Sequence, residues 1–566
     1  QKEPLWIVLS LAMIILVDLL IIFLTNSIRV GSVIVPFVLF IFAVVVCVVY
    51  EFRGIPMMAP DILTVQTATS VMGNYTFKLT FEQYSVILVC MAFFFTFLRL
   101  HEVKVTEKRV FHIAGFIVVA LGCGLFTNQI ILSDFMEEHQ INIRMFRPME
   151  SYQKYGGVLT FARSVGYAVV KKPEGYTTAK VDQIIQEYEK KSANEQQSTA
   201  KQYPNIITVV NETFADFKTN EDYMPYFHSL KKNCVTGYTY ASIVGGQTAN
   251  TEFELLTGNT LGFLSAGTTA FQLYIHGQMP SLVSNLKAEG YSGNKAMHPF
   301  NPYNYNRPAV YKDFGFTDFI DKFDFHKNVK RVREYISDEA NVDRIISEYE
   351  KNRKKTDQPF YMYNMTIQNH SPYDKDAANF KQPIKIESSK YDAEANRYLN
   401  LIKYSDDSLK QLTSYFEKCK EPTIILFLGD HQPRLTDEFM NKITNGQYQT
   451  WSSEQMMKRY QVPFVIWANY DIKEQHIEKT SMNYIQSILT KTAGVKMTGY
   501  QRFLNEVRKE VPTITSQGYW GKNGKFYQIN DKGSPYYGII QKYRMIQYNM
   551  MFDKKNRRDS FFEVSK

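Results

Sequence analysis

The sequence predicts two unlike parts: a bundle of membrane-spanning helices, then an α/β domain whose mainly parallel central sheet is flanked by helices. Long apolar runs dominate before about residue 132, whereas the chain after about residue 170 is charged, mixed and rich in aromatic residues. In that second part, short apolar runs typical of buried strands alternate with amphipathic helical stretches. This alternation favours a parallel sheet with helices on both faces.

Four apolar runs make up the first part, at residues 5–24, 30–50, 84–98 and 111–132. An α-helix rises 1.5 Å per residue, so about 20 residues cross a hydrocarbon core roughly 30 Å thick. The first, second and fourth runs meet this length, and the third is shorter. Four such runs so close together argue against buried helices of a soluble core, so we expect about four membrane spans.

Basic residues in short loops predict the orientation of these spans. The link between the third and fourth runs carries Arg99, Lys104, Lys108 and Arg109, whereas the link at 51–83 has few cations. Because basic loops stay in the cytoplasm, the chain after about residue 133 is expected outside the cell. The same count places Gln1 outside, and since the chain does not begin with Met we expect a first transmembrane helix to be missing.

The predicted domains are a transmembrane domain at 1–132, connecting helices and a linker at 133–202, and an extracellular catalytic domain at 203–566. Only Cys234 and Cys419 lie in the exported part, so no disulfide framework or cysteine metal motif is indicated. The net charge of +9 suits a protein at an anionic membrane. The sequence has no basic cluster that would indicate a nucleic-acid partner.

Several predicted strands end on residues capable of chemistry. The runs at 205–210, 291–297, 360–367 and 423–429 lead into Glu212, His298, His370 and the pair Asp430 and His431. A single histidine is more often structural than a ligand. In a parallel sheet, however, the carboxyl ends of strands share one edge, where ligands bind. The four strand ends together therefore predict a functional site, whereas the run at 462–468 lacks such an ending.

The stretch "GGQTANTEFELLTGN" (245–259) predicts a helix start with Thr248 at or just before the N-cap. Capping alone would explain a threonine there and is worth about 1 kcal/mol. A helix N-terminus also stabilises a negatively charged phosphate group. A Thr248 hydroxyl there would therefore be placed to act as a nucleophile on that phosphate. A threonine hydroxyl needs activation, and Glu212, Asp430 and His431 offer oxygen and imidazole ligands for a divalent ion that could supply it.

With these motifs, the chain resembles the lipoteichoic acid synthase family, which lies within the alkaline phosphatase and sulfatase superfamily. The threonine loop, the segment "LGDHQPRL" and the segment "FRGIPMMAPDILTVQTATSVMGNYTF" (52–77) carry the resemblance. Members are polyglycerolphosphate polymerases, that is phosphoglycerol transferases, which build cell-wall lipoteichoic acid in Gram-positive bacteria. They usually have five spans, which agrees with a missing first helix.

The resemblance implies roles for eight residues. The implied metal ligands, for Mn²⁺ or another divalent ion such as Mg²⁺ or Zn²⁺, are Glu212, Thr248, Asp430 and His431, and Thr248 is also the implied nucleophile. The implied substrate-binding residues are His298, Tyr305 and Arg307 of "HPFNPYNYNR" and His370 of "TIQNHSPY". The sequence departs from the family at Ala249 and Asn250, where Ser-Asp is usual, and at Tyr305, where Trp is usual.

The implied reaction transfers glycerophosphate from phosphatidylglycerol, through a glycerophospho-threonine, to a glycolipid or polyglycerolphosphate acceptor. A primase, or an enzyme that decorates another glycan with phosphoglycerol or phosphoethanolamine, remains an alternative. A phosphoethanolamine transferase usually carries several disulfides, and a sulfatase needs a C/S-x-P-x-R motif, which the sequence lacks. An inactive membrane sensor or scaffold would have no use for all four implied metal ligands.

Overall fold

The computed structural model describes residues 5–53, 56–64, 81–99, 101–133, 135–139, 141, 148–166, 170, 172–192, 202–265, 268–385, 393–447 and 450–564. The chain forms two compact units, built in the main from residues 1–170 and 171–566. Most of the segment 52–77 and most of the predicted polar linker lie outside the described residues. The boundaries 1–132, 133–202 and 203–566 stay a prediction.

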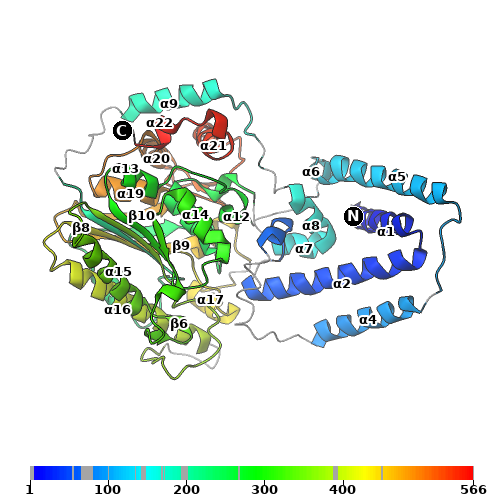
Figure 1. The fold of residues 1–566 in the computed structure, drawn as a ribbon, viewed down its shortest axis with the longest axis horizontal. Coiled ribbons are helices and arrows are strands. Elements are labelled where there is room, and N and C mark those ends of the chain that lie inside the picture. The colour runs from blue at the N-terminus through cyan, green and yellow to red at the C-terminus, as the bar shows by residue number, and fades with distance from the viewer. Residues whose placement is uncertain are drawn as a thin grey trace. The chain divides into compact units, whose positions relative to one another are not determined.

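The first unit is helical. Its long helices are α1 (Leu5–Thr25), α2 (Ile28–Arg53), α4 (Phe81–Leu98) and α5 (Arg109–Phe126), the last extended by a π-helical turn, η2 (Thr127–Ile131). Shorter elements are η1 (Ala59–Thr64), α6 (Phe135–Glu138), α7 (Pro148–Tyr155) and α8 (Gly157–Val165). Helix α1 packs against α2 and α5, and α2 packs against α4 (Figure 1).

Within the described residues, three segments are long and apolar enough to cross a membrane: Leu5–Thr25, Ile28–Tyr50 and Arg109–Ile131. Their outer surfaces expose large apolar side chains such as Val118 (68%) and Leu121 (64%), which water would disfavour and hydrocarbon accommodates. The run at 84–98 forms most of α4, whose apolar part is shorter. The protein is therefore anchored in a membrane.

The second unit is built on an eight-stranded sheet with the order β10-β2-β9-β8-β1-β7-β3-β4. Its strands are β1 (Asn205–Asn211), β2 (Cys234–Tyr240), β3 (Ser292–Met297), β4 (Asp318–Ile320), β7 (Phe360–Met365), β8 (Thr423–Gly429), β9 (Gln461–Ala468) and β10 (Gln475–Ser481). All neighbouring pairs are parallel except those that β9 makes with β8 and β2. The predicted mainly parallel sheet is thus confirmed.

The antiparallel direction of β9 explains one feature of the sequence. Because β9 runs opposite to β8, its carboxyl end lies at the other edge of the sheet. The run at 462–468 accordingly ends without a candidate site residue.

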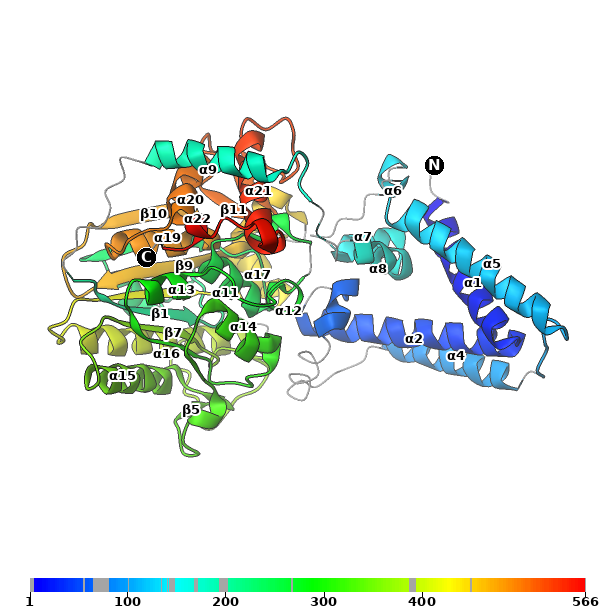
Figure 2. The same cartoon turned by 45° about the horizontal axis from the view of Figure 1, so that its top comes forward.

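Helices cover both faces of this sheet (Figure 2). Helices α15 (Asp338–Arg353) and α16 (Ala393–Phe416) lie on one face, and α11 (Thr248–Thr257), α13 (Leu282–Ala288), α19 (Met482–Thr492) and α20 (Gly499–Glu510) lie on the other. Every residue of β1, β7 and β8 is buried, as expected for strands enclosed on both sides. One hydrophobic core lies between the sheet and the α15 and α16 layer.

The remaining helices and strands complete the second unit. They are α9 (Thr178–Ser192), α10 (Pro225–Ser229), α12 (Ala270–Leu273), α14 (Arg307–Phe314), α17 (Asp437–Thr444), α18 (Ser453–Met456), α21 (Tyr537–Phe552), α22 (Asp559–Phe562), the hairpin β5 (Arg331–Val332) and β6 (Tyr335–Ile336), and the small sheet of β11 (Thr513–Thr515), β12 (Gly518–Trp520) and β13 (Phe526–Tyr527). Cys234 and Cys419 are free thiols.

Candidate active site

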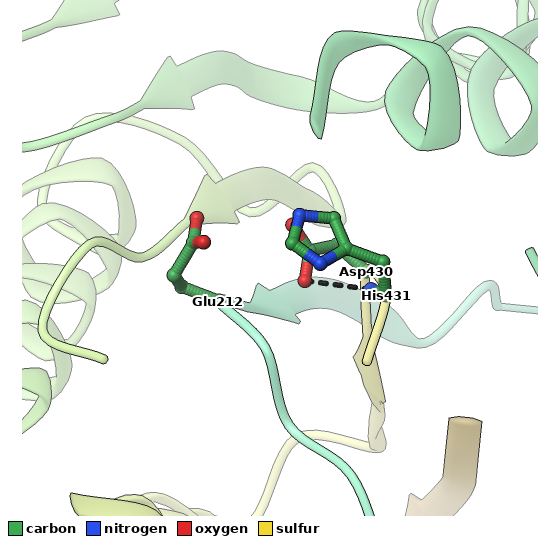
Figure 3. A group of neighbouring side chains, drawn as sticks. All are labelled: Glu212, Asp430 and His431. Carbon is green, nitrogen blue, oxygen red and sulfur yellow. Dashed lines mark hydrogen bonds and ion pairs between the residues drawn. The ribbon is translucent and has the colours of Figure 1, made fainter. Parts of the chain in front are cut away.

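Two central strands deliver acidic side chains to the same point. Strands β1 and β8 pair in parallel with Asn211 opposite Gly429, so the next residues, Glu212 and Asp430, leave the sheet side by side. One ligand atom each from Glu212, Asp430 and His431 lies within 4.8 Å of the others. Figure 3 shows these side chains gathered at the strand ends. All three are buried.

Asp430 is oriented by the backbone around it. Its Oδ1 accepts hydrogen bonds from the N–H groups of Thr213 and His431, both at 2.7 Å. Its Oδ2 lies 3.2 Å from Nε2 of His431. Neither Oδ2 nor Nε2 has a hydrogen-bond partner in the part of the chain that the structure describes. Two buried polar atoms are therefore directed at one point without protein partners.

The electrostatics of this cluster favour a cation. Burial raises the pKa of Glu212 well above its usual range, and the nearby charge of Asp430 raises it further. Burial also raises the pKa of Asp430. Two adjacent buried carboxylates are costly unless a positive charge compensates them. Carboxylate oxygens, an imidazole nitrogen and two unpartnered buried atoms together fit a divalent metal ion.

Thr248 is the first residue of α11, and Gln247 occupies the N-cap in a left-handed conformation with φ of 63°. The expectation that Thr248 lies at or just before the N-cap is therefore off by one residue, and no side chain caps this helix. The Thr248 side chain instead lies near enough to Asp430 to lower the pKa of that carboxyl, which partly offsets the rise that burial causes. Thr248 thus adjoins the acidic cluster.

Helix α11 is bonded to its surroundings on both sides. The hydroxyl of Thr251 donates to the Asp430 carbonyl at 2.8 Å. The side chain of Asn250 accepts from the N–H of Ala270, at the start of α12, at 2.9 Å. Ala249 and Asn250, where the sequence departs from the family, are both buried. The departure at Asn250 therefore supplies a hydrogen bond between two helices.

Arg307 begins α14 and is buried in an ion pair with Glu252 of α11. Its Nε and Nη2 donate to Oε1 of Glu252 at 3.1 and 2.7 Å. The hydroxyls of Tyr311 and Tyr363 donate to Oε2 of the same carboxylate, at 2.5 and 3.1 Å. Sequence reasoning gave no role to Glu252, although an acid four residues after Thr248 lies on the same side of the helix.

Tyr305 lies against the same guanidinium. The Arg307 carbon Cζ is 5.1 Å from the centre of the Tyr305 ring, which is cation–π distance. The backbone here is unusual, because Tyr305 and Asn306 both have positive φ, at 59° and 56°. These two left-handed residues turn the chain from η5 (Asn304–Asn306) into α14.

The two predicted substrate histidines adjoin this cluster. Burial lowers the pKa of His298 well below its usual range, and the charge of Arg307 acts in the same direction. Burial likewise lowers the pKa of His370 to about 4, with a smaller contribution from the charge of His431. Each histidine directs Nδ1 at a backbone carbonyl, that of Met365 at 3.0 Å and that of Ser371 at 2.7 Å.

Both histidines therefore have one available ring nitrogen. Because a carbonyl can only accept, Nδ1 carries the proton and Nε2 is the acceptor in the neutral ring.

Asn369 is a supporting residue that the sequence did not reveal as such. Its Nδ2 donates to the side chains of Asn211 and Ser405 and to the carbonyl of Glu212, at 3.0, 2.8 and 3.0 Å. These bonds connect the ends of β1 and β7 to α16. The only sequence signal was its position immediately before His370.

The structure thus brings the predicted residues to one edge of the sheet. Glu212, Asp430 and His431 form the possible metal centre, with Thr248 beside Asp430. Arg307 adjoins Glu212 and His298 electrostatically, and His370 adjoins His431.

Comparison with known proteins identifies related sequences and folds. The sequence profile of the sulfatase family matches residues 204–495. A protein of Rhizobium meliloti (strain 1021) named for cyclic beta-1,2-glucan modification is 30% identical over 436 residues, covering 74% of this chain and 65% of its own. A lipoteichoic acid synthase of Staphylococcus saprophyticus is 23% identical over 373 residues, covering 62% of this chain and 55% of its own.

The chain therefore spans less than two thirds of the length of either relative. Among solved structures, the Streptococcus pyogenes phosphoglycerol transferase GacH in complex with sn-glycerol-1-phosphate has a TM-score of 0.56 at 20% identity. The alignment covers 70% of this chain and 100% of that one, which shows a shared fold.

Proposed function

The chain belongs to the sulfatase family, and from this premise we propose that it is a membrane-anchored phosphotransferase acting on phosphatidylglycerol. It transfers glycerophosphate to a hydroxyl group of an acceptor, with Thr248 as the nucleophile. The observation that carries this proposal is the buried Thr248 side chain beside Asp430, at a cluster of buried Glu212, Asp430 and His431. The relatives named lipoteichoic acid synthase and phosphoglycerol transferase support the choice of donor.

In this proposal Glu212, Thr248, Asp430 and His431 hold a divalent ion, Mn²⁺ by family resemblance. When bound, such an ion lowers the pKa of a ligated hydroxyl and offsets negative charge on a phosphate. The unpartnered Oδ2 of Asp430 and Nε2 of His431 support this assignment, because both are strong metal ligands.

The first step forms a bond between Thr248 Oγ and phosphorus and breaks the bond from phosphorus to the diacylglycerol oxygen. Thr248 loses its hydroxyl proton, and the departing diacylglycerol oxygen takes up a proton. In the second step the acceptor hydroxyl attacks the glycerophospho-threonine, loses its proton, and restores the Thr248 hydroxyl. Helix α11 begins at Thr248, so its N-terminal amides face the developing negative charge.

The remaining residues bind and orient the phosphate group. Arg307 contributes a planar guanidinium that Tyr305 stacks against, and Glu252 fixes its orientation. His298 and His370, neutral at physiological pH with Nε2 as acceptor, are suited to accept a hydrogen bond from a headgroup or acceptor hydroxyl.

Two acceptor classes follow from the relatives. A polyglycerolphosphate chain or glycolipid fits the relative named lipoteichoic acid synthase, and a glycan fits the one named for cyclic beta-1,2-glucan modification. The relative named for cyclic beta-1,2-glucan modification aligns over more of this chain, and at higher identity, than the lipoteichoic acid synthase does. This favours a glycan-decorating transferase as the second candidate. The catalytic unit lies outside the cell in either case, as the loop charges predict.

A single experiment tests the donor and the nucleophile. Membranes containing the protein are incubated with labelled phosphatidylglycerol and Mn²⁺, and diacylglycerol, product and protein adduct are measured. We expect diacylglycerol release and a glycerophosphate adduct on Thr248, both lost in Thr248→Ala. Undiminished turnover in Thr248→Ala with no adduct in the wild type would exclude the mechanism. A polymer ladder indicates a synthase, and a single addition indicates a primase or decorating enzyme.

A further inference from the structure

We propose that Glu252 adapts the phosphate site to a phosphodiester monoanion, and against a phosphomonoester dianion, by neutralising the charge of Arg307. The inference rests on the proposed function, in which Arg307 binds the phosphate of the donor. It adds a specificity-determining residue and a preference, for diesters such as phospholipid headgroups over monoesters with the same organic group.

The Glu252 carboxylate is completely enclosed by donors. It is 0% exposed, and both of its oxygens are engaged by Arg307, Tyr311 and Tyr363 at 2.5–3.1 Å. All of these groups donate, so the acceptor-only carboxylate form of Glu252 suits this environment. Arg307 is 1% exposed, so solvent does little to screen the pair.

The pair lies close enough to the cluster to affect a bound phosphate. Glu252 lies four residues after Thr248 on α11, which is about one helical turn. The pair therefore adjoins the proposed nucleophile. Nε and Nη2 of Arg307 are bonded to Glu252, and Nη1 lies outside the pair.

Charge balance then distinguishes two kinds of phosphate. A phosphodiester carries one negative charge at neutral pH, whereas a phosphomonoester carries between one and a half and two. A buried guanidinium without a counter-ion would favour the more highly charged ester. With Glu252 beside it, the pair is neutral overall, and Arg307 contributes hydrogen bonding and orientation while adding little net positive charge.

The alternative is that Glu252 only stabilises the fold. Helix α11 offers a matched control, because Glu254 is equally buried two residues further along. Its Oε1 accepts from Ser242, Thr260 and the backbone N–H of Leu261, away from Arg307. The variants Glu252→Gln and Glu254→Gln therefore make the same chemical change on one helix. Tyr311→Phe removes one hydrogen bond from Glu252 and leaves both charges in place.

The experiment uses the full chain in nanodiscs with Mn²⁺ at pH 8. The KM for phosphatidylglycerol is measured by diacylglycerol release, and phosphatidate with the same acyl chains serves as the competing monoester. The quantity compared is Ki for phosphatidate divided by KM for phosphatidylglycerol. Because neither constant depends on the concentration of active enzyme, partial misfolding of a variant leaves this ratio unchanged.

In the wild type we expect the ratio to exceed about ten, and in Glu252→Gln to fall by about tenfold as the unmatched Arg307 attracts the dianion. Glu254→Gln and Tyr311→Phe are expected to keep the wild-type ratio. An unchanged ratio in Glu252→Gln, or an equal fall in Glu254→Gln, would overturn the inference.

If Glu252→Gln does not fold, the wild type alone still decides, because a ratio at or below one contradicts the inference. Failure of the wild type to release diacylglycerol from phosphatidylglycerol would instead contradict the proposed function itself.

Discussion

Glu212 and Asp430 are buried acidic residues that lower the stability of the folded protein unless a cation lies between them. The charge of Asp430 raises the pKa of Glu212, and the two orphaned atoms at the cluster add a desolvation cost. A residue that completes a metal site in this way stabilises the protein only when the metal is present.

Asp430→Asn is expected to remove the metal-dependent stability of the catalytic unit. In the wild type, Mn²⁺ at 100 times its Kd should add about 2.7 kcal/mol to the free energy of unfolding. In the variant this gain should disappear, while the Tm in EDTA stays level or rises because a buried charge is gone. Differential scanning fluorimetry with and without Mn²⁺ measures both quantities.

Asp406→Asn is the matched control for that measurement. Asp406 is also buried, but it accepts hydrogen bonds from the backbone of Tyr226 and Phe227, in contacts separate from the cluster. It should keep the full response to Mn²⁺. A normal Mn²⁺ response in Asp430→Asn would show that the metal does not use this carboxylate.

At the scale of elements, the site depends on how closely two strand ends approach each other. Gly429 is the last residue of β8, immediately before Asp430. A Cβ atom added there would lie 1.9 Å from the carbonyl oxygen of Phe214, in the segment that follows β1. The absence of a side chain at this position therefore allows Glu212 and Asp430 to meet.

Gly429→Ala should separate these strand ends and weaken metal binding by about tenfold or more, with a loss of stability of about 1–3 kcal/mol. Isothermal titration with Mn²⁺ and thermal melting measure the two effects. Gly446→Ala is the control, because a Cβ there meets no atom of the described residues within 4 Å and should leave both unchanged. Wild-type Mn²⁺ affinity in Gly429→Ala would contradict this account of the strand ends.

The elements themselves were largely predictable, and their exact ends were less so. The strands at 205–210, 423–429 and 462–468 are apolar runs of normal strand length, and they form β1, β8 and β9 within one residue. Strands β2 and β10 were not predicted, because "CVTGYTY" and "QHIEKTS" are too polar to be distinguished from loops. The start of α11 was misplaced by one residue because Gln247 adopts a left-handed conformation that the sequence does not signal.

At the scale of the whole molecule, the membrane-spanning segments and the candidate catalytic residues belong to different units. The predicted catalytic residues all belong to the second unit, whereas the three long apolar segments belong to the first. An anchor of this kind holds a catalytic site at high effective concentration near a lipid substrate.

A fragment spanning residues 172–566 is therefore expected to bind Mn²⁺ as the full chain does, yet to release diacylglycerol from phosphatidylglycerol vesicles at least about tenfold more slowly. Turnover per protein at equal lipid concentration measures the loss. Fusion of the fragment to an unrelated transmembrane helix should recover most of the rate. If the rate does not recover, the membrane unit takes a direct part in binding the lipid.

Local sequence patterns were sufficient for the architecture and for grouping most of the candidate site residues. Apolar runs of about 20 residues, alternation of strands and helices, and polar residues at strand ends are visible residue by residue, because hydrophobic burial imposes its period on neighbouring positions. Glu212, Asp430 and His431 could thus be expected at one edge of the sheet before their contacts were known.

Packing between distant segments decided the rest. Glu252 and Arg307 lie 55 residues apart, and their pairing depends on α11 meeting α14, which no local pattern encodes. The antiparallel direction of β9 and the close approach of Gly429 to Phe214 likewise arise only when the sheet is assembled. The types of residue at the candidate site could be predicted from the sequence. The balance of charge among them depends on side chains that meet only in the folded protein.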